Sequence, residues 1–188
     1  MLKRTRWGLT FLAVTTTVLT AVPDTPATAD AAPSGTGETY TVTLLTGDVV
    51  TVRPTGGRCP AVSVEPAEPN GVIRRSCGPD GHVRVIPARV AAQVGTVLDP
   101  ALFDVTALIA DGYDDARTQE IPVIVRPAGQ ARVAALAGVR ALPSIGSVAG
   151  HVPKKKAAAA KRTAQSLLAD AEKVWLDRRV RATSLPAT

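Results

Sequence analysis

The stretch LDPALFDVTALIADGYDDARTQEIPVIV, from Leu98 to Val125, decides how the chain is organised. Its first half contains a dense apolar cluster that the rest of the fold must cover: Leu102, Phe103, Val105, Leu108 and Ile109. Residues 112–115 are of the types that form turns, so they end this cluster. Residues 121–125 are rich in β-branched residues and predict a strand. Short strands are predicted before this stretch and alanine-rich helix after it. The stretch therefore marks the boundary between two structural units.

Composition limits the class of protein. A chain of 188 residues has room for one or two small domains. The hydrophobic fraction of 45% supports a packed core and argues against extensive disorder. Aromatic residues make up only 3%, so the core must consist mainly of Val, Leu, Ile and Ala. The formal net charge of +6 permits an acidic partner but does not require one.

The first 31 residues predict a signal peptide. Basic residues at positions 3, 4 and 6 precede an apolar run over residues 8–22, and small residues flank the sites after Ala29 and Ala31. The apolar run is shorter than the roughly 20 residues that a membrane-spanning helix needs. We expect cleavage after Ala29 or Ala31, secretion to the extracellular space and no stable membrane association of the mature chain.

The first unit, residues 39–115, is expected to be a small antiparallel β-rich domain that follows a flexible leader at residues 32–38. Turn residues separate its predicted strands, which are residues 40–45, 49–52, 61–64, 71–75 and 82–86. A short helix is predicted over residues 88–94. Cys59 and Cys77 flank the third and fourth strands, so in an exported chain we expect a disulfide across a hairpin.

The second unit, residues 120–182, alternates strands and helices. A strand at 121–125, a helix at 129–141, a weaker strand at 142–148, a helix at 154–173 and a last strand from residue 174 are predicted. This order is typical of a ferredoxin-like, or split βαβ, sandwich. The expected fold class is therefore α+β, with a β-rich domain, a ferredoxin-like domain and a C-terminal tail at 183–188.

Taken together, five stretches of the chain resemble the leader of large secreted subtilisin-like serine proteases (subtilases) of actinobacteria. They are VTLLTGDVVTV (42–52), LDPALFDVTALIADGYDD (98–115), IPVIV (121–125), ALPSIGSVAG (141–150) and KVWLDRRVRA (173–182). The resemblance covers nearly the whole chain after the signal peptide. It implies a propeptide that folds, acts as an intramolecular chaperone for the protease domain, and inhibits that domain until it is cleaved off.

The resemblance also implies roles for the C-terminal residues. In subtilisin-like precursors the sheet of the pro-region packs on the protease domain, and the tail lies in the substrate cleft as a product-like strand. Mapped onto this chain, the protease-contacting tail is Val180, Arg181, Ala182, Thr183, Ser184 and Leu185. Trp175 either packs on the sheet or serves as an anchor against the protease. The implied partner is a subtilisin-like protease domain, in cis or in trans.

The catalytic motifs of that family do not occur in this sequence. The family needs an activated Ser, a His and an Asp, each in its own glycine-containing motif. Here His82 and His151 are the only histidines, and neither is followed by Gly-Thr. We therefore expect no enzyme activity. Two interpretations stay open: a fragment truncated before the catalytic domain, and a stand-alone inhibitor.

The alternative function is a secreted, non-catalytic binding or structural protein unrelated to any protease. No cofactor or metal is expected, because the aspartates at 111, 114 and 115 lack the spacing of a calcium loop. No nucleic-acid partner is expected either, because few aromatic residues could stack on bases. The basic residues at 154–156 and 161–162 fit a solvated helix face.

Overall fold

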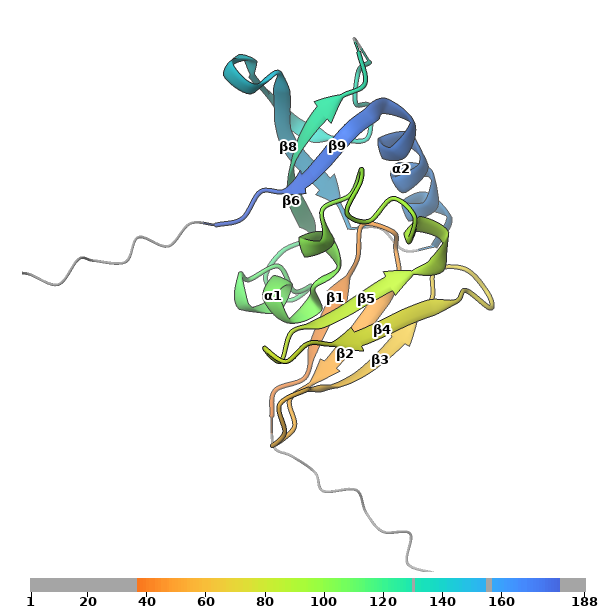
Figure 1. Ribbon diagram of the computed structural model, residues 1–188, viewed down its shortest axis with the longest axis vertical. Helices are drawn as coiled ribbons and strands as arrows, with labels where there is room; N and C mark the ends of the chain where they lie inside the picture. Colours follow the sequence, from red (N-terminus) through yellow and green to blue (C-terminus); the bar gives the residue numbers. More distant parts are fainter. Residues whose placement is uncertain (1–36, 130, 155–156, 180–188) are drawn as a thin grey trace, which may run out of the picture. The chain divides into compact units, whose positions relative to one another are not determined.

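The computed structural model describes residues 37–129, 131–154 and 157–179, with 157 and 158 described by their backbone only. The described chain is an α+β protein that is rich in strands, and every strand pair in its sheets is antiparallel (Figure 1). The predicted signal peptide, with Ala29 and Ala31, and the predicted tail residues from Val180 onward lie outside the described residues.

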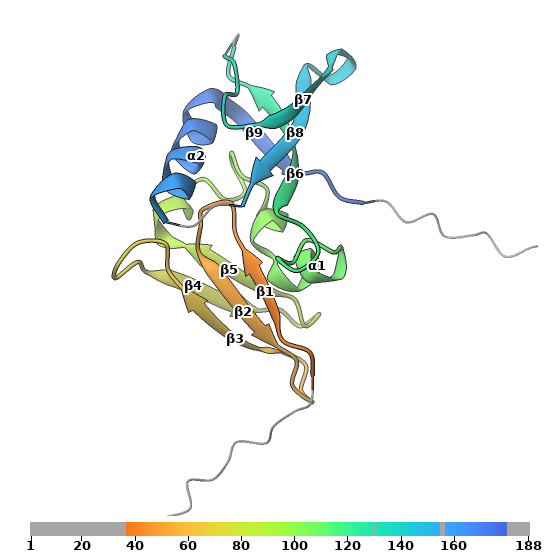
Figure 2. The same cartoon turned by 180° about the vertical axis from the view of Figure 1, so that it is seen from behind.

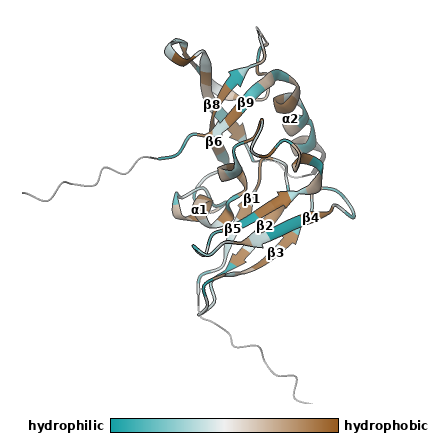
Figure 3. Ribbon diagram, in the orientation of Figure 1, coloured by the Kyte–Doolittle hydropathy of each residue, from teal (hydrophilic) through white to brown (hydrophobic). Residues whose placement is uncertain are grey.

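The first part of the chain forms two small sheets. Strands β1 (Tyr40–Thr43), β2 (Val49–Arg53) and β3 (Ala61–Glu65) pair in the order β1-β2-β3, and β4 (Ile73–Cys77) pairs with β5 (Val83–Pro87). Buried and more exposed residues alternate along β2 and β5, as expected for strands with one face on a core. β4 is largely hydrophilic and exposed (Figure 3). Each of the five strands predicted in this part of the chain is present, as β1 to β5.

The predicted hairpin between the third and fourth strands is wrong. β3 pairs with β2, and β4 pairs with β5, so the two strands that follow one another in sequence belong to different sheets. The turn at Asn70, whose φ is 59°, allows this change of sheet because asparagine tolerates the left-handed conformation. The chain therefore crosses from one sheet to the other where a simple hairpin was expected.

The apolar cluster of the central stretch lies in the core. The stretch forms a 3₁₀ turn, η2 (Pro100–Phe103), and one short helix, α1 (Val105–Ala110); a second 3₁₀ turn, η1 (Ala88–Val90), precedes it. Only η1 remains of the helix predicted over 88–94. The carboxylates of Asp99 and Asp104 accept hydrogen bonds from backbone N–H groups at the starts of η2 and α1, respectively. Leu102, Phe103, Val105 and Leu108 are fully buried, as predicted.

The second part is a four-stranded sheet with one helix. Strands β6 (Glu120–Pro127), β7 (Ala137–Leu142), β8 (Ser147–Pro153) and β9 (Ala171–Leu176) pair in the order β7-β8-β6-β9, and α2 (Ala157–Asp170) connects β8 to β9 (Figure 2). Because β8 and β9 are both antiparallel to β6, they are parallel to each other and lie on its two sides. The helix predicted over 154–173 and the strands predicted at 121–125 and from residue 174 are present, with shifted ends.

The helix predicted over residues 129–141 is wrong. No described residue between β6 and β7 is helical, and residues 137–142 form the edge strand β7 instead. Pro127 and Gly129 open the segment, and Gly138 has a φ of 61°, so the alanines lack an uninterrupted helical run. The weak strand predicted at 142–148 is also misplaced: η3 (Pro143–Ile145) makes the turn, and β8 begins at Ser147.

Buried residues from both parts of the chain form a single hydrophobic cluster. It includes Val42 and Val85 of the small sheets, Leu102 of η2, Val123 of β6 and Leu167 of α2. The backbone also joins the parts, since the N–H of Asp99 donates to the carbonyl of Val174 in β9 at 2.9 Å. The ranges predicted as two domains thus share one core.

Candidate functional site

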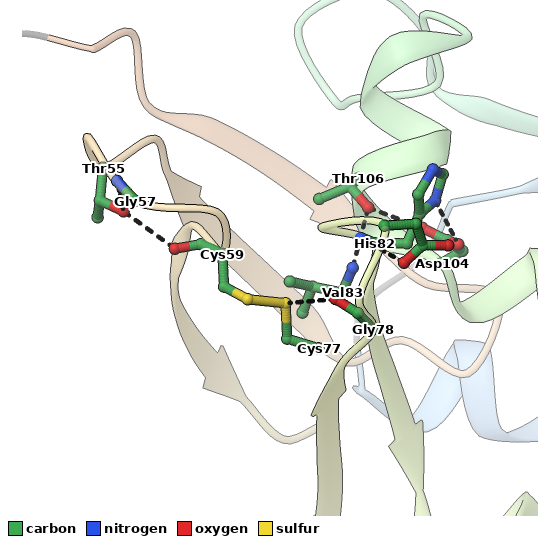
Figure 4. The surroundings of a disulfide bond; sticks show 10 residues. Thr55, Gly57, Cys59, Cys77, Gly78, His82, Val83, Asp104 and Thr106 are labelled. Atoms are coloured by element: carbon green, nitrogen blue, oxygen red, sulfur yellow. Dashed lines mark hydrogen bonds and ion pairs between the residues drawn. A yellow bond between two sulfur atoms is a disulfide. The ribbon is translucent and has the colours of Figure 1, made fainter.

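The disulfide between Cys59 and Cys77 links the two small sheets. The two Cα atoms lie 6.3 Å apart, within the normal range for a disulfide. Cys59 precedes β3 and Cys77 ends β4, so the bond joins strands of separate sheets (Figure 4). The predicted pairing is confirmed, whereas the expected placement across one hairpin is not. A disulfide of this kind is typical of proteins in an oxidising compartment.

Close to the disulfide, His82 and Asp104 form a pair that sequence analysis missed. The Nδ1 atom of His82 lies 2.8 Å from Oδ2 of Asp104, whose other oxygen accepts from the hydroxyl of Thr106 at 2.8 Å (Figure 4). Asp104 is 5% exposed and also caps α1. An aspartate directly before an apolar helical run is a recognisable N-cap signal, but its contact with His82 depends on the tertiary structure.

This His–Asp pair resembles two thirds of a catalytic triad, yet its surroundings fit a structural role. In the described part of the chain, no serine or cysteine side chain forms a hydrogen bond with the His82 ring. The hydroxyl of Thr106 is occupied, because it donates to Asp104 and accepts from the N–H of Val83 at 3.0 Å. These contacts join β5 to the start of α1.

The four-stranded sheet has an outer face that turns away from the core. Along β6, buried residues alternate with partly exposed ones, and the buried set belongs to the same cluster as Leu167 of α2. The opposite set of β6 and its partners in the register are what we call the outer face: Glu120, Pro122, Ile124, Arg126, Ala137, Arg140, Ala149, His151, Pro153, Lys173 and Trp175. Among them Glu120 is acidic, and it stands at the first position of β6.

Trp175 lies on the outer face in the edge strand β9. It is paired in register with Ile124 of β6, which is itself paired with Ala149 of β8. The guanidinium of Arg126 lies 5.4 Å from the centre of the Trp175 ring, at cation–π distance. Trp175 is partly exposed. Its ring therefore lies on the sheet, in a position where a partner could also contact it.

The residues that follow β9 border the outer face. The N–H of Asp177 donates to the carbonyl of Pro122 at 3.0 Å, which continues the pairing with β6 beyond the end of the strand. A polar pocket of about 340 Å³ lies at this place. Its lining includes Pro122 and His151 of the outer face together with residues 177–179. The root of the predicted tail is thus placed beside the outer face.

The aspartates at 111, 114 and 115 each form an ion pair with a basic side chain of the protein. Arg178 contacts Asp111, Arg117 contacts Asp114, and Lys154 contacts Asp115. In the residues that the structure describes, no group of three or more His, Cys, Asp or Glu side chains is arranged to hold a metal ion.

Tyr113 is a buried titratable residue near the tail. Its side chain is 2% exposed, and burial raises the pKa of its phenol above the usual value of 10.0. Arg179 opposes this effect in part, because its backbone N–H and its positive charge favour the phenolate. Sequence analysis placed Tyr113 in a turn, and its contact with the chain beyond β9 could not be predicted from that position.

Comparisons of the whole chain with protein-family models, with curated proteins and with solved structures found no match. Among the described residues, no helix has the length and apolar character needed to cross a membrane.

Proposed function

We propose that this chain is the pro-region of a secreted subtilisin-like serine protease, acting as folding template and inhibitor of the protease domain. The observation that carries the proposal is the position of the tail root. β9 ends at Leu176, and residues 177–179 leave the sheet at the border of its outer face. One partner could therefore contact the outer face and the tail at the same time.

The topology of the second part supports the proposal. The order β7-β8-β6-β9, with α2 crossing from β8 to the parallel strand β9, is the strand order of a ferredoxin-like sheet. The first crossover, between β6 and β7, departs from that fold because its described residues are not helical. We propose a ferredoxin-like propeptide domain that has lost its first helix.

The outer face has the composition of a docking surface. An apolar row crosses three of its strands, with Ala149 in β8, Ile124 in β6 and Trp175 in the edge strand β9. Its charged members are the basic residues Arg126, Arg140 and Lys173 and, at the start of β6, Glu120. Complementarity then favours a protease surface with an apolar patch bordered by acidic residues. Trp175 is the proposed anchor, because buried tryptophans commonly dominate the energy of an interface.

The tail supplies the second contact. An extended segment from Val180 to Leu185 could add to an exposed strand of the substrate cleft through main-chain hydrogen bonds. Because the tail is linked to a docked sheet, its effective concentration at the cleft is high, and the linked pair binds more tightly than either part. Pro186 removes one main-chain donor, so the pairing is expected to end before it.

The proposal is tested by inhibition. The purified chain is mixed with an actinobacterial subtilisin-like protease, and slow, tight inhibition is expected. Trp175→Ala should weaken inhibition more than tenfold, in line with the loss of an interface anchor. Val72→Ala is the matched control, because Val72 is 72% exposed and lies outside the four-stranded sheet. Deletion of residues 182–188 should also weaken inhibition.

A second measurement tests the template role. A denatured subtilisin-like protease domain is diluted into buffer with and without the chain, and recovered activity is measured after the chain has been removed by proteolysis. More recovered activity with the chain is expected. If the folded chain neither inhibits nor assists refolding of any such protease, the proposal is lost, and a secreted, non-catalytic binding protein becomes the better interpretation.

A further inference from the structure

The chain that follows β9 is held at three points by the end of the central stretch. The hydroxyl of Tyr113 donates to the carbonyl of Asp177 at 3.0 Å. The guanidinium Nε of Arg178 lies 3.1 Å from Oδ2 of Asp111. The guanidinium of Arg179 lies over the ring of Tyr113, 5.5 Å from its centre. Three consecutive residues are thus contacted by two side chains that flank a single turn.

The strand that precedes these residues is fixed by the same part of the chain. The N–H of Asp99 donates to the carbonyl of Val174 at 2.9 Å, and the N–H of Val174 donates to the carbonyl of Val97 at 2.8 Å. The ammonium of Lys173 donates to the carbonyls of residues 95 and 96. Contacts from residues 95–99 and then from residues 111–113 therefore follow the chain from Lys173 to Arg179.

We propose that Asp111 and Tyr113 are positioning residues that set the direction in which the chain leaves β9 and so present the tail to its partner. We call the contacts of these two side chains with residues 177–179 the tail clamp. The partner in question is the protease of the proposed function, and that part of the inference rests on it. An ordered tail root reduces the entropy lost on binding, so the clamp increases affinity without touching the protease.

The two side chains of the tail clamp, Asp111 and Tyr113, differ in how far they also support the fold. The ring of Tyr113 belongs to the hydrophobic cluster, so it also supports the fold. Its hydroxyl reaches only the chain beyond β9, so replacement by phenylalanine removes one clamp contact and keeps the ring. Asp111 follows the last residue of α1, and its contact with Arg178 is partly exposed. Asp111→Asn removes the charge with little change in shape.

A protease-independent experiment tests the clamp itself. The purified full chain is digested with a small amount of trypsin, and cleavage of the Arg178–Arg179 bond is followed by mass spectrometry. Cleavage of a native chain reports how often the segment opens locally. Tyr113→Phe and Asp111→Asn should each increase the cleavage rate about three- to tenfold, and the double variant should increase it further, as expected for loss of a weak contact. Unchanged rates in both variants would overturn the clamp.

Tyr40→Phe is the matched control. Its hydroxyl contacts the carboxylate of Glu38 at 3.0 Å, in a part of the chain remote from β9 in sequence. This variant should leave cleavage of the Arg178–Arg179 bond unchanged. Thermal unfolding of every variant is recorded in parallel. If cleavage increases only in proportion to a lower melting temperature, and Tyr40→Phe shows the same increase, general destabilisation explains the result and the clamp is also overturned.

Inhibition of a subtilisin-like protease then tests the effect on the partner. Tyr113→Phe and Asp111→Asn should weaken inhibition about three- to tenfold, and this effect should largely vanish when residues 182–188 are deleted, because most of the tail that the clamp positions is then gone. If the variants change trypsin cleavage but the unmodified chain inhibits no protease, the clamp stands and the proposed function fails. If the chain inhibits and the variants inhibit equally well, the clamp has no role in presentation.

Discussion

The ammonium of Lys154 lies 2.8 Å from Oδ1 of Asp115, and the lysine side chain is only 2% exposed. The same ammonium donates to the carbonyl of Tyr113 at 2.5 Å. Asp115 in turn accepts from the N–H of Thr43 at 2.8 Å and from its hydroxyl at 2.7 Å. One ion pair therefore joins the loop before α2, the central stretch and β1.

Lys154→Met should destabilise the protein. It removes the positive partner of a mostly buried carboxylate, and the remaining hydrogen bonds from Thr43 compensate only in part. We expect the free energy of unfolding to fall by about 2–3 kcal/mol, measured by urea denaturation. Lys161→Met is the control, because its pair with Glu68 is more exposed, at 51% and 34%, and solvent screens it, so its loss should change stability much less. An equal effect of the two substitutions would contradict the role of Lys154.

Arg89→Met should lower the free energy of unfolding more than Lys154→Met does. The guanidinium of Arg89 lies 2.6 Å from Asp48, whose side chain is fully buried. Loss of the arginine leaves a buried carboxylate with hydrogen bonds from Thr46 and from the N–H of Ala67, but without a countercharge. We expect a loss of about 3–5 kcal/mol in urea unfolding. Arg89→Met combined with Asp48→Asn should recover part of that loss, and no recovery would mean that the charge of Asp48 is not the cause.

The disulfide should contribute measurable stability because it joins two sheets that share no strand pair. The unreduced protein should have no titratable thiol, in agreement with the pairing of both cysteines. Replacement of Cys59 and Cys77 by serine should lower the free energy of unfolding by about 3 kcal/mol, as expected for a loop of this length. Thiol titration and urea unfolding, with and without reductant, measure both effects. A double variant as stable as the parent would show that contacts such as Arg75 with the carbonyl of Val62 suffice to hold the sheets.

Tyr113 should make the protein sensitive to alkali. Burial raises the pKa of its phenol in the folded state, whereas in the unfolded chain it returns to about 10. The folded state therefore binds this proton more tightly. The corresponding stability is fully present below about pH 10 and is lost as the pH rises through the raised pKa. Urea unfolding of the parent and of Tyr113→Phe from pH 8 to 11 measures how the free energy of unfolding of each protein depends on pH. If this dependence is the same for both proteins, the prediction is wrong.

Several features of this protein were determined by sequence alone. Alternating valines and turn residues identified the strands of both small sheets, because the two-residue period of a strand is a local property. Leu102, Phe103, Val105 and Leu108 were correctly placed in the core, because large apolar side chains that lie this close together in the sequence must be covered. The pairing of Cys59 with Cys77 followed from the presence of only two cysteines.

Other features were decided only by the tertiary structure. Which strands pair depends on competition between distant segments, so a hairpin between β3 and β4 could not be distinguished from two separate sheets. The alanines of residues 131–141 favour helix locally, but β8 offers β7 a partner, and such pairing overrides weak propensity. The contacts of Asp111 and Tyr113 with residues 177–179, and of His82 with Asp104, join positions separated by at least 22 residues. Because a side chain's partner across the fold leaves no local signal, these contacts emerge only when the sheets are assembled.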